Sequence, residues 1–115
     1  MKIVVLKFGG TSVGTIEKIK NVANIISNYI KKKYKVIVVS SAMSGVTNEL
    51  ISKSKEISKN FSDSEYDALV SSGEQVACSL IAGRLIHKGL KSRSWLAWQI
   101  PITTVGSHKN SRINW

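Results

Sequence analysis

Residues 2–14 read KIVVLKFGGTSVG, an apolar, β-branched run that ends in two adjacent glycines. Residues 2–8 are short and bounded by glycine, which is typical of a buried strand. Over residues 15–33 apolar side chains recur every three or four positions, which predicts an amphipathic helix with Thr15 as its N-cap. Residues 35–40 are again continuously apolar, like a strand covered on both faces. Strand, helix and strand form a βαβ unit, so the sheet should be at least partly parallel.

The rest of the chain predicts further helices and one more strand. After a polar turn at 41–45 we expect a weaker helix, and the capping-box pattern at 62–65 predicts the start of a short one. A separate helix is expected to begin at residue 73 and to end at the C-cap glycine Gly89. Residues 90–98 predict a third strand, followed by loop. No closing helix or cap follows, so we expect an incomplete sheet.

Bulk composition narrows the class of protein. A chain of 115 residues suits one domain, and a hydrophobic content of 43% argues against disorder. The apolar runs are too short to span a bilayer, and the apolar start is too short for a signal peptide. The single cysteine suits a reducing compartment, so we expect a cytoplasmic protein without a membrane partner. Cys78, His87 and His108 lack the spacing of metal ligands, so no protein-held metal is expected.

The formal net charge of +10 raises the question of an anionic partner. Lysines cluster at 31–35 and 53–59, and such clusters can attract nucleic acid. Arginine-rich patches with interleaved aromatic side chains, which read bases, are absent. We therefore interpret the lysines as a solvated surface and expect no nucleic-acid partner, while a basic nucleic-acid-binding module stays as an alternative hypothesis.

The glycine loop after the first predicted strand indicates an anion site. Glycines let backbone N–H groups approach a ligand closely, and the helix N-terminus adds partial positive charge. Lys7 lies two residues before Gly9 on the same strand face, and a lysine about 4 Å from a phosphate oxygen gains roughly 4 kcal/mol at an effective dielectric of 20. The lysine precedes the loop, so this is not a Walker A motif. The alternative is a tight turn beside a stray lysine.

Two later junctions carry polar side chains of the same kind. Ser41 and Thr47 follow the second strand, where ligands sit in parallel sheets, and their hydroxyls could bond a carboxylate or phosphate. Glu74 could hold a substrate ammonium group. The alternatives are a turn-forming serine, a helix cap at Thr47 or Asn48, and a first-turn glutamate that favours the helix dipole.

Taken together, the three junctions resemble the aspartate kinases of the amino-acid kinase family. The segments that carry the resemblance are KFGGTSVG at 7–14, VSSAMSGVT at 39–47 and SGEQV at 72–76. The resemblance implies an α/β fold, a mostly parallel sheet with helices on both faces. It also implies ATP with Mg²⁺, the metal being held mainly by the nucleotide phosphates, and L-aspartate as the partners. The ATP phosphates would be bound by Lys7, which would also be catalytic, with Phe8, Gly9 and Gly10; the substrate would be bound by Ser41, Thr47 and Glu74.

The reaction implied is transfer of the γ-phosphoryl group to the aspartate side chain, which yields 4-phospho-L-aspartate for lysine, threonine and methionine synthesis. The carboxylate is already ionised near neutral pH, so positioning and charge neutralisation should carry catalysis. Members of the family continue well beyond this length. We therefore expect residues 1–115 to be the N-terminal part of one kinase domain, without a second or ACT domain, inactive alone and prone to self-association. A ligand-free oligomerising remnant is the other alternative.

Overall fold

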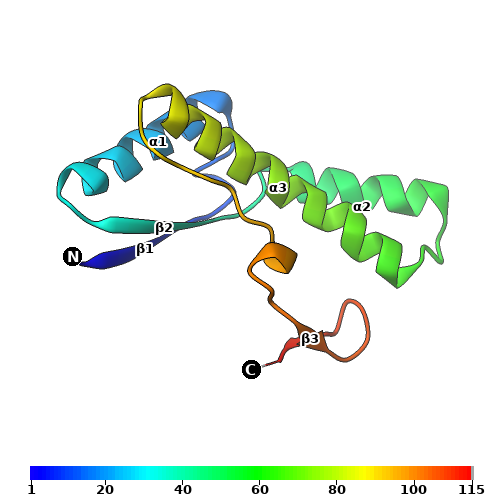
Figure 1. Ribbon diagram of the computed structural model, residues 1–115. Helices are drawn as coiled ribbons and strands as arrows, with labels where there is room; N and C mark the ends of the chain where they lie inside the picture. The colour runs from blue at the N-terminus through cyan, green and yellow to red at the C-terminus, as the bar shows by residue number, and fades with distance from the viewer. Residues whose placement is uncertain (115) are drawn as a thin grey trace.

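The computed structural model describes residues 1–114. Two parallel strands, β1 (Ile3–Phe8) and β2 (Lys35–Ser40), pair in register from Ile3 opposite Lys35 to Phe8 opposite Ser40. Helix α1 (Ile16–Lys31) connects them and lies along the sheet (Figure 1). Thr15 is its N-cap, since the Thr15 Oγ1 accepts a hydrogen bond from the Lys18 backbone N–H at 3.2 Å. The βαβ unit and this cap are therefore confirmed.

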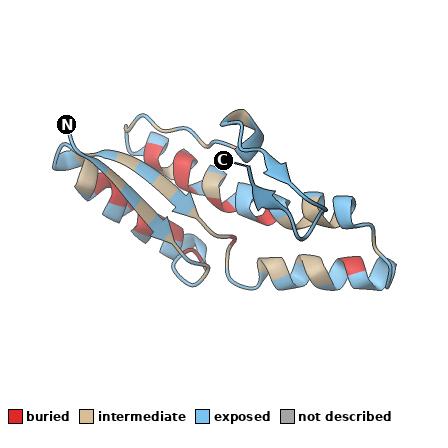
Figure 2. Ribbon diagram, turned by 90° about the horizontal axis from the view of Figure 1, so that it is seen from below, coloured by how far each residue is buried: buried red, intermediate tan, exposed pale blue. Residues whose placement is uncertain are grey.

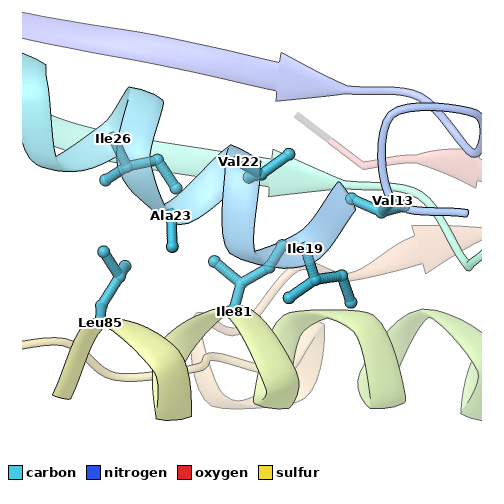
Figure 3. Packing of buried hydrophobic residues seen from close by; sticks show 7 residues of the cluster. All are labelled: Val13, Ile19, Val22, Ala23, Ile26, Ile81 and Leu85. Atoms are coloured by element: carbon cyan, nitrogen blue, oxygen red, sulfur yellow. The ribbon is translucent and has the colours of Figure 1, made fainter. Parts of the chain in front are cut away.

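The core lies between the sheet and two helices. Helices α1 and α3 (Asp63–His87) pack side by side on one face of the strands. Figure 3 shows Ile81 and Leu85 of α3 pointing toward the apolar side of α1. The strands contribute alternate residues that pack on this cluster, Leu6 and Phe8 from β1 and Val36 and Val38 from β2. The buried cluster itself consists of Val13, Ile19, Val22, Ala23, Ile26, Ile81 and Leu85.

The other face of the sheet is open within residues 1–114. Its apolar side chains retain about half or more of their exposure, 64% for Ile3, 60% for Val5, 53% for Ile37 and 49% for Val39. The α/β class with a parallel sheet is confirmed. Helices were expected on both faces, whereas those described cover one, because α2 (Val46–Ile57) packs along α3 and extends past the sheet (Figures 1 and 2).

The prediction of two separate helices, a short one starting at 62–65 and another starting at residue 73, is wrong. Helix α3 is one continuous helix with Gly73 buried in its interior. Ser62 is the N-cap residue as predicted, but its hydroxyl hydrogen-bonds the Ser64 hydroxyl at 3.0 Å and makes no cap bond. Gly89 follows the C-cap with φ of +85°, so the predicted end of the helix is confirmed.

The predicted third strand over residues 90–98 is wrong. This segment runs past β2 across a hollow of about 680 Å³ and pairs with no strand, and its last two residues begin a short 3₁₀ helix, η1 (Ala97–Gln99). A strand pattern without a hydrogen-bonded neighbour does not make a strand. In the segment predicted as loop, β3 (Thr104–Val105) and β4 (Arg112–Ile113) form a small antiparallel hairpin. No helix within residues 1–114 has both the length and the apolar character needed to cross a membrane.

Candidate functional site

Three segments that are far apart in the sequence line one hollow of about 400 Å³ beyond the carboxyl ends of β1 and β2. The glycine loop supplies one wall, the loop after β2 a second and α3 the third. Parallel strands end at the same edge of a sheet, which is why these junctions meet. The lining residues are Gly10, Thr11, Ser41, Ala42, Met43, Ser44, Gly45, Thr47, Asn48 and Glu74.

The loop after β2 is held by backbone hydrogen bonds. The Ser41 N–H donates to the Phe8 carbonyl oxygen at 3.0 Å, which continues the ladder between the two strands. Gly45, with φ of +82°, is the N-cap residue of α2, and its carbonyl accepts from the Glu49 N–H at 3.0 Å. The alternative of a cap at Thr47 or Asn48 is therefore wrong. Thr47 lies in the first turn of α2, beside the hollow.

The glycine loop contributes only part of the residues predicted from the sequence. A tight turn, closed by the Ser12 N–H to the Gly9 carbonyl at 3.1 Å, brings Gly10 to the hollow. Phe8 packs on the core instead. Lys7 is exposed on the open face of β1, and neither it nor Gly9 lines the hollow. The structure thus brings Gly10 together with Ser41, Thr47 and Glu74, but not Lys7, Phe8 or Gly9.

Glu74 has a setting that its sequence position did not predict. It lies in the middle of α3, so a first-turn interaction with the helix dipole does not explain it. Ion pairs within residues 1–114 join Glu17 to Lys20, Glu49 to Lys53, Asp63 to Lys109 and Asp67 to His108, and Glu74 belongs to none of them. Its exposed carboxylate is therefore available to a cationic group of a ligand.

Cys78, one turn after Glu74, reports on the same region. Burial raises the pKa of its thiol, the Glu74 carboxylate raises this pKa further, and the Ser40 backbone acts in the opposite direction. Cys78 also lines a neighbouring hollow together with Ser40 and Glu74. Cys78 was not predicted to lie near the site, because its place in the helix expected from residue 73 does not show which face of that helix packs toward β2.

The donor set limits how Mg²⁺ could be bound. Protein-bound Mg²⁺ usually has one or two carboxylate ligands and completes its shell with water and phosphate oxygens. The hollow offers the Glu74 carboxylate and several hydroxyls, and residues 1–114 contain no cluster of three His, Cys, Asp or Glu side chains that could bind a metal. These residues fit a metal that arrives with nucleotide phosphates, not one held by protein ligands alone.

The larger hollow of about 680 Å³ is a weaker candidate. It lies between β2 and residues 91–95, beside the unpaired edge of that strand, and aliphatic side chains of α1 and α3 line much of it. The smaller hollow has hydroxyls and a carboxylate from three segments at the strand ends, the place where α/β proteins bind ligands. We therefore take the smaller hollow as the candidate site.

Comparison with known proteins shows the family to which the chain belongs. The sequence model of the family described as Amino acid kinase family matches residues 2–114. The chain belongs to the amino acid kinase family. An aspartokinase from Geobacillus stearothermophilus is 49% identical over 113 residues, and one from Rickettsia felis is 47% identical over 116 residues. A crystal structure of aspartate kinase from Synechocystis superposes with a TM-score of 0.73 at 41% identity, over 76% of this chain and 15% of that one.

The match to these kinases covers a limited share of their length. It takes in 98% of this chain but 28% of the Geobacillus stearothermophilus protein and 29% of the Rickettsia felis protein. The described part of this amino acid kinase family member includes the three segments that line the candidate hollow. Thr11, Met43, Ser44 and Asn48 also line the hollow and were not predicted from the sequence as binding residues, although all four stand within or directly beside the three motifs.

Proposed function

We propose that this chain forms the phosphate- and aspartate-binding part of an aspartate kinase, which transfers the γ-phosphoryl group of ATP to the side-chain carboxylate of L-aspartate. The observation that carries the proposal is the convergence of Gly10, Ser41, Thr47 and Glu74 on one hollow at the strand ends. Relatives that are 43–49% identical and carry the names aspartokinase or aspartate kinase support it. The product is 4-phospho-L-aspartate, which feeds lysine and other amino-acid synthesis in the cytoplasm.

Each residue has a physical role in this proposal. The backbone N–H groups of Gly9 and Gly10 bind phosphate oxygens at the entrance to α1, where the helix dipole favours negative charge. Lys7 lies two residues before Gly9 on the open face of β1 and outside the hollow, so in this proposal its long side chain extends past the end of the strand to the same phosphates and neutralises charge as the phosphoryl group moves. Phe8 holds the loop in place through the core. Mg²⁺, when bound with ATP, neutralises phosphate charge.

The substrate side of the site lies opposite. Ser41 and Thr47 hydroxyls donate hydrogen bonds to aspartate carboxylate oxygens, and the Glu74 carboxylate accepts from the aspartate ammonium group. Because the attacking carboxylate is already ionised, the site needs no general base. Holding the two reactants in line and neutralising the phosphate charge together supply the rate enhancement.

Titration calorimetry with Mg·ATP tests the phosphate half of the proposal. We expect heat of binding at millimolar nucleotide, and we expect Lys7→Ala to weaken binding because one cation near the phosphates is lost. Lys31→Ala, in the last turn of α1 and remote from the loop, is the control and should leave affinity unchanged. Absence of heat with the native chain would favour a ligand-free remnant, and equal affinities of the two variants would remove Lys7 from the site.

A second candidate, a basic nucleic-acid-binding module, is favoured only by the net charge of +10. Binding through lysines alone would release counterions, so its affinity would fall steeply with salt. Titration with duplex and single-stranded DNA across salt concentrations separates the two. Useful affinity at physiological salt would support the module, whereas binding confined to low salt would leave the kinase proposal in place.

A further inference from the structure

Gly73 occupies a place where a helix normally carries a side chain. It is buried in the interior of α3, directly before Glu74. Glycine is less favourable than alanine in a helix interior, so its presence there calls for a packing reason. A Cβ on Gly73 would lie 2.9 Å from Val46 Cγ1, 3.3 Å from Leu50 Cδ1 and 3.4 Å from Ala42 Cβ. The start of α2 and the loop before it thus pack directly on the backbone of α3.

Two of the residues that pack on Gly73 are next to Ser41 and Thr47, the two residues proposed to bind the substrate carboxylate. Val46 is the first residue of α2 and precedes Thr47, and the buried Ala42 follows Ser41. Val46 is β-branched, so its side chain has few other rotamers with which to avoid an added methyl group. Any widening at Gly73 would therefore move the loop and the first turn of α2 away from Glu74.

The glycine loop contacts the same segment from the opposite side. A Cβ on Gly10 would lie 3.3 Å from the Ala42 carbonyl oxygen, and one on Gly14 would lie 3.3 Å from Ser44 Cβ. By contrast, a Cβ on Gly9 or Gly83 would meet nothing within 4 Å. Close contacts with glycine are thus concentrated on residues 42–46, which lie between the glycine loop and α3.

We propose that Gly73 is a positioning residue that fixes the separation between Glu74 and the loop of Ser41 and Thr47. Gly14 supports the same loop from the other side. The proposal deepens the aspartate-binding role given above and rests on it for the identity of the ligand, but the position of the loop can be measured without ligand. Gly73 touches no reactant in this account and acts only through residues 42–46.

The test uses the ¹⁵N-labelled chain and compares the amide chemical shifts of Gly73→Ala with those of Gly83→Ala. Gly83 is on the same helix with open space around it, so its variant should leave the loop amides unchanged. Gly73→Ala should shift the amides of residues 41–47 more than those of α1, which packs on Ile81 and Leu85 farther along α3. The double variant Gly73→Ala/Val46→Ala lacks the Val46 Cγ1 atom that the new methyl group would meet. Its amide shifts at residues 41–47 should therefore be close to those of the Val46→Ala single variant.

The proposal is overturned if Gly73→Ala perturbs residues 41–47 no more than Gly83→Ala does, or if Val46→Ala gives no rescue. Should Gly73→Ala fail to fold, the double variant with Val46→Ala decides the role of Gly73: recovery of a folded amide spectrum supports the contact, and continued failure to fold overturns it. Titration with L-aspartate is a separate readout, in which Gly73→Ala should bind more weakly than Gly83→Ala. If the native chain itself binds no L-aspartate, the proposed function fails while the loop shifts still decide the role of Gly73.

Discussion

Glu74 and Cys78 are neighbours whose interaction can be measured. One helical turn separates them on α3, and the carboxylate is the second cause, after burial, of the raised pKa of the Cys78 thiol. The thiolate is the reactive form of cysteine, so a raised pKa leaves less of it at neutral pH. The rate of cysteine alkylation therefore reports the charge state and the position of the residue proposed to bind the substrate ammonium group.

We predict that Cys78 reacts with iodoacetamide along a pH profile displaced to higher pH than that of a free cysteine. Glu74→Gln removes a negative charge that disfavours the thiolate, so the pKa should fall and the profile should move toward lower pH. Glu65→Gln, in the first turn of α3, is the matched control and should leave the profile in place. Identical profiles for all three proteins would place the Glu74 carboxylate away from the thiol.

The sequence could predict which residues meet at the candidate site only where the order and direction of the strands bring them together. The βαβ pattern places the ends of β1 and β2 at one edge, so the convergence of Gly10 with Ser41 and Thr47 follows from hydrophobic periodicity alone. The position of Glu74 in the middle of a long helix could not be predicted, because a glycine followed by a glutamate looks like the start of a helix. Val46, which packs on Gly73, lies 27 positions away in the sequence, and helix propensities, which describe single residues, do not predict such nonlocal contacts.

Among the elements, the sheet shows most clearly what its sequence pattern can and cannot predict. A continuous apolar run correctly predicted β2, but it predicted burial on both faces, whereas Ile37 and Val39 are exposed within residues 1–114. Residues 90–98 likewise have the alternation of a strand but lie beside β2 without pairing to it. A sequence pattern indicates that a segment can pair as a strand or be buried. Whether it does so depends on a neighbouring strand or helix from another part of the fold.

The open face of β1 and β2 should make the chain self-associate. Burying a valine or isoleucine contributes about 1.5–3 kcal/mol, so Val5→Lys or Ile37→Lys should each weaken association by about tenfold or more. Both side chains point to solvent, so the fold should tolerate the change. Ile57→Lys is the control, since this equally apolar residue is 78% exposed at the end of α2. Size-exclusion chromatography with light scattering measures the effect, and an unchanged mass distribution for Val5→Lys and Ile37→Lys would rule out this face.

At the scale of the whole molecule, the shape is extended for the chain length. The radius of gyration is 16.0 Å, against about 13 Å for a compact domain of this size. The arm of α2 and the adjoining half of α3, together with the β3–β4 hairpin, projects from the βαβ unit (Figure 1). The aspartokinases it matches are more than three times as long. We therefore propose that this chain supplies one part of a site, and its role is best tested in a protein that contains the rest.

The most direct test is the Michaelis constant for L-aspartate in a chimera. This chain would replace the 113 matched residues of the Geobacillus stearothermophilus aspartokinase, and ADP formation would be followed in the native, Glu74→Gln and Glu65→Gln forms. We predict aspartate-dependent activity in the native chimera, and a KM for L-aspartate raised by about tenfold or more in Glu74→Gln alone, since a hydrogen bond to a charged group contributes about 1.5–3 kcal/mol. A folded native chimera without activity, or a Glu74→Gln form with an unchanged KM, would contradict the account.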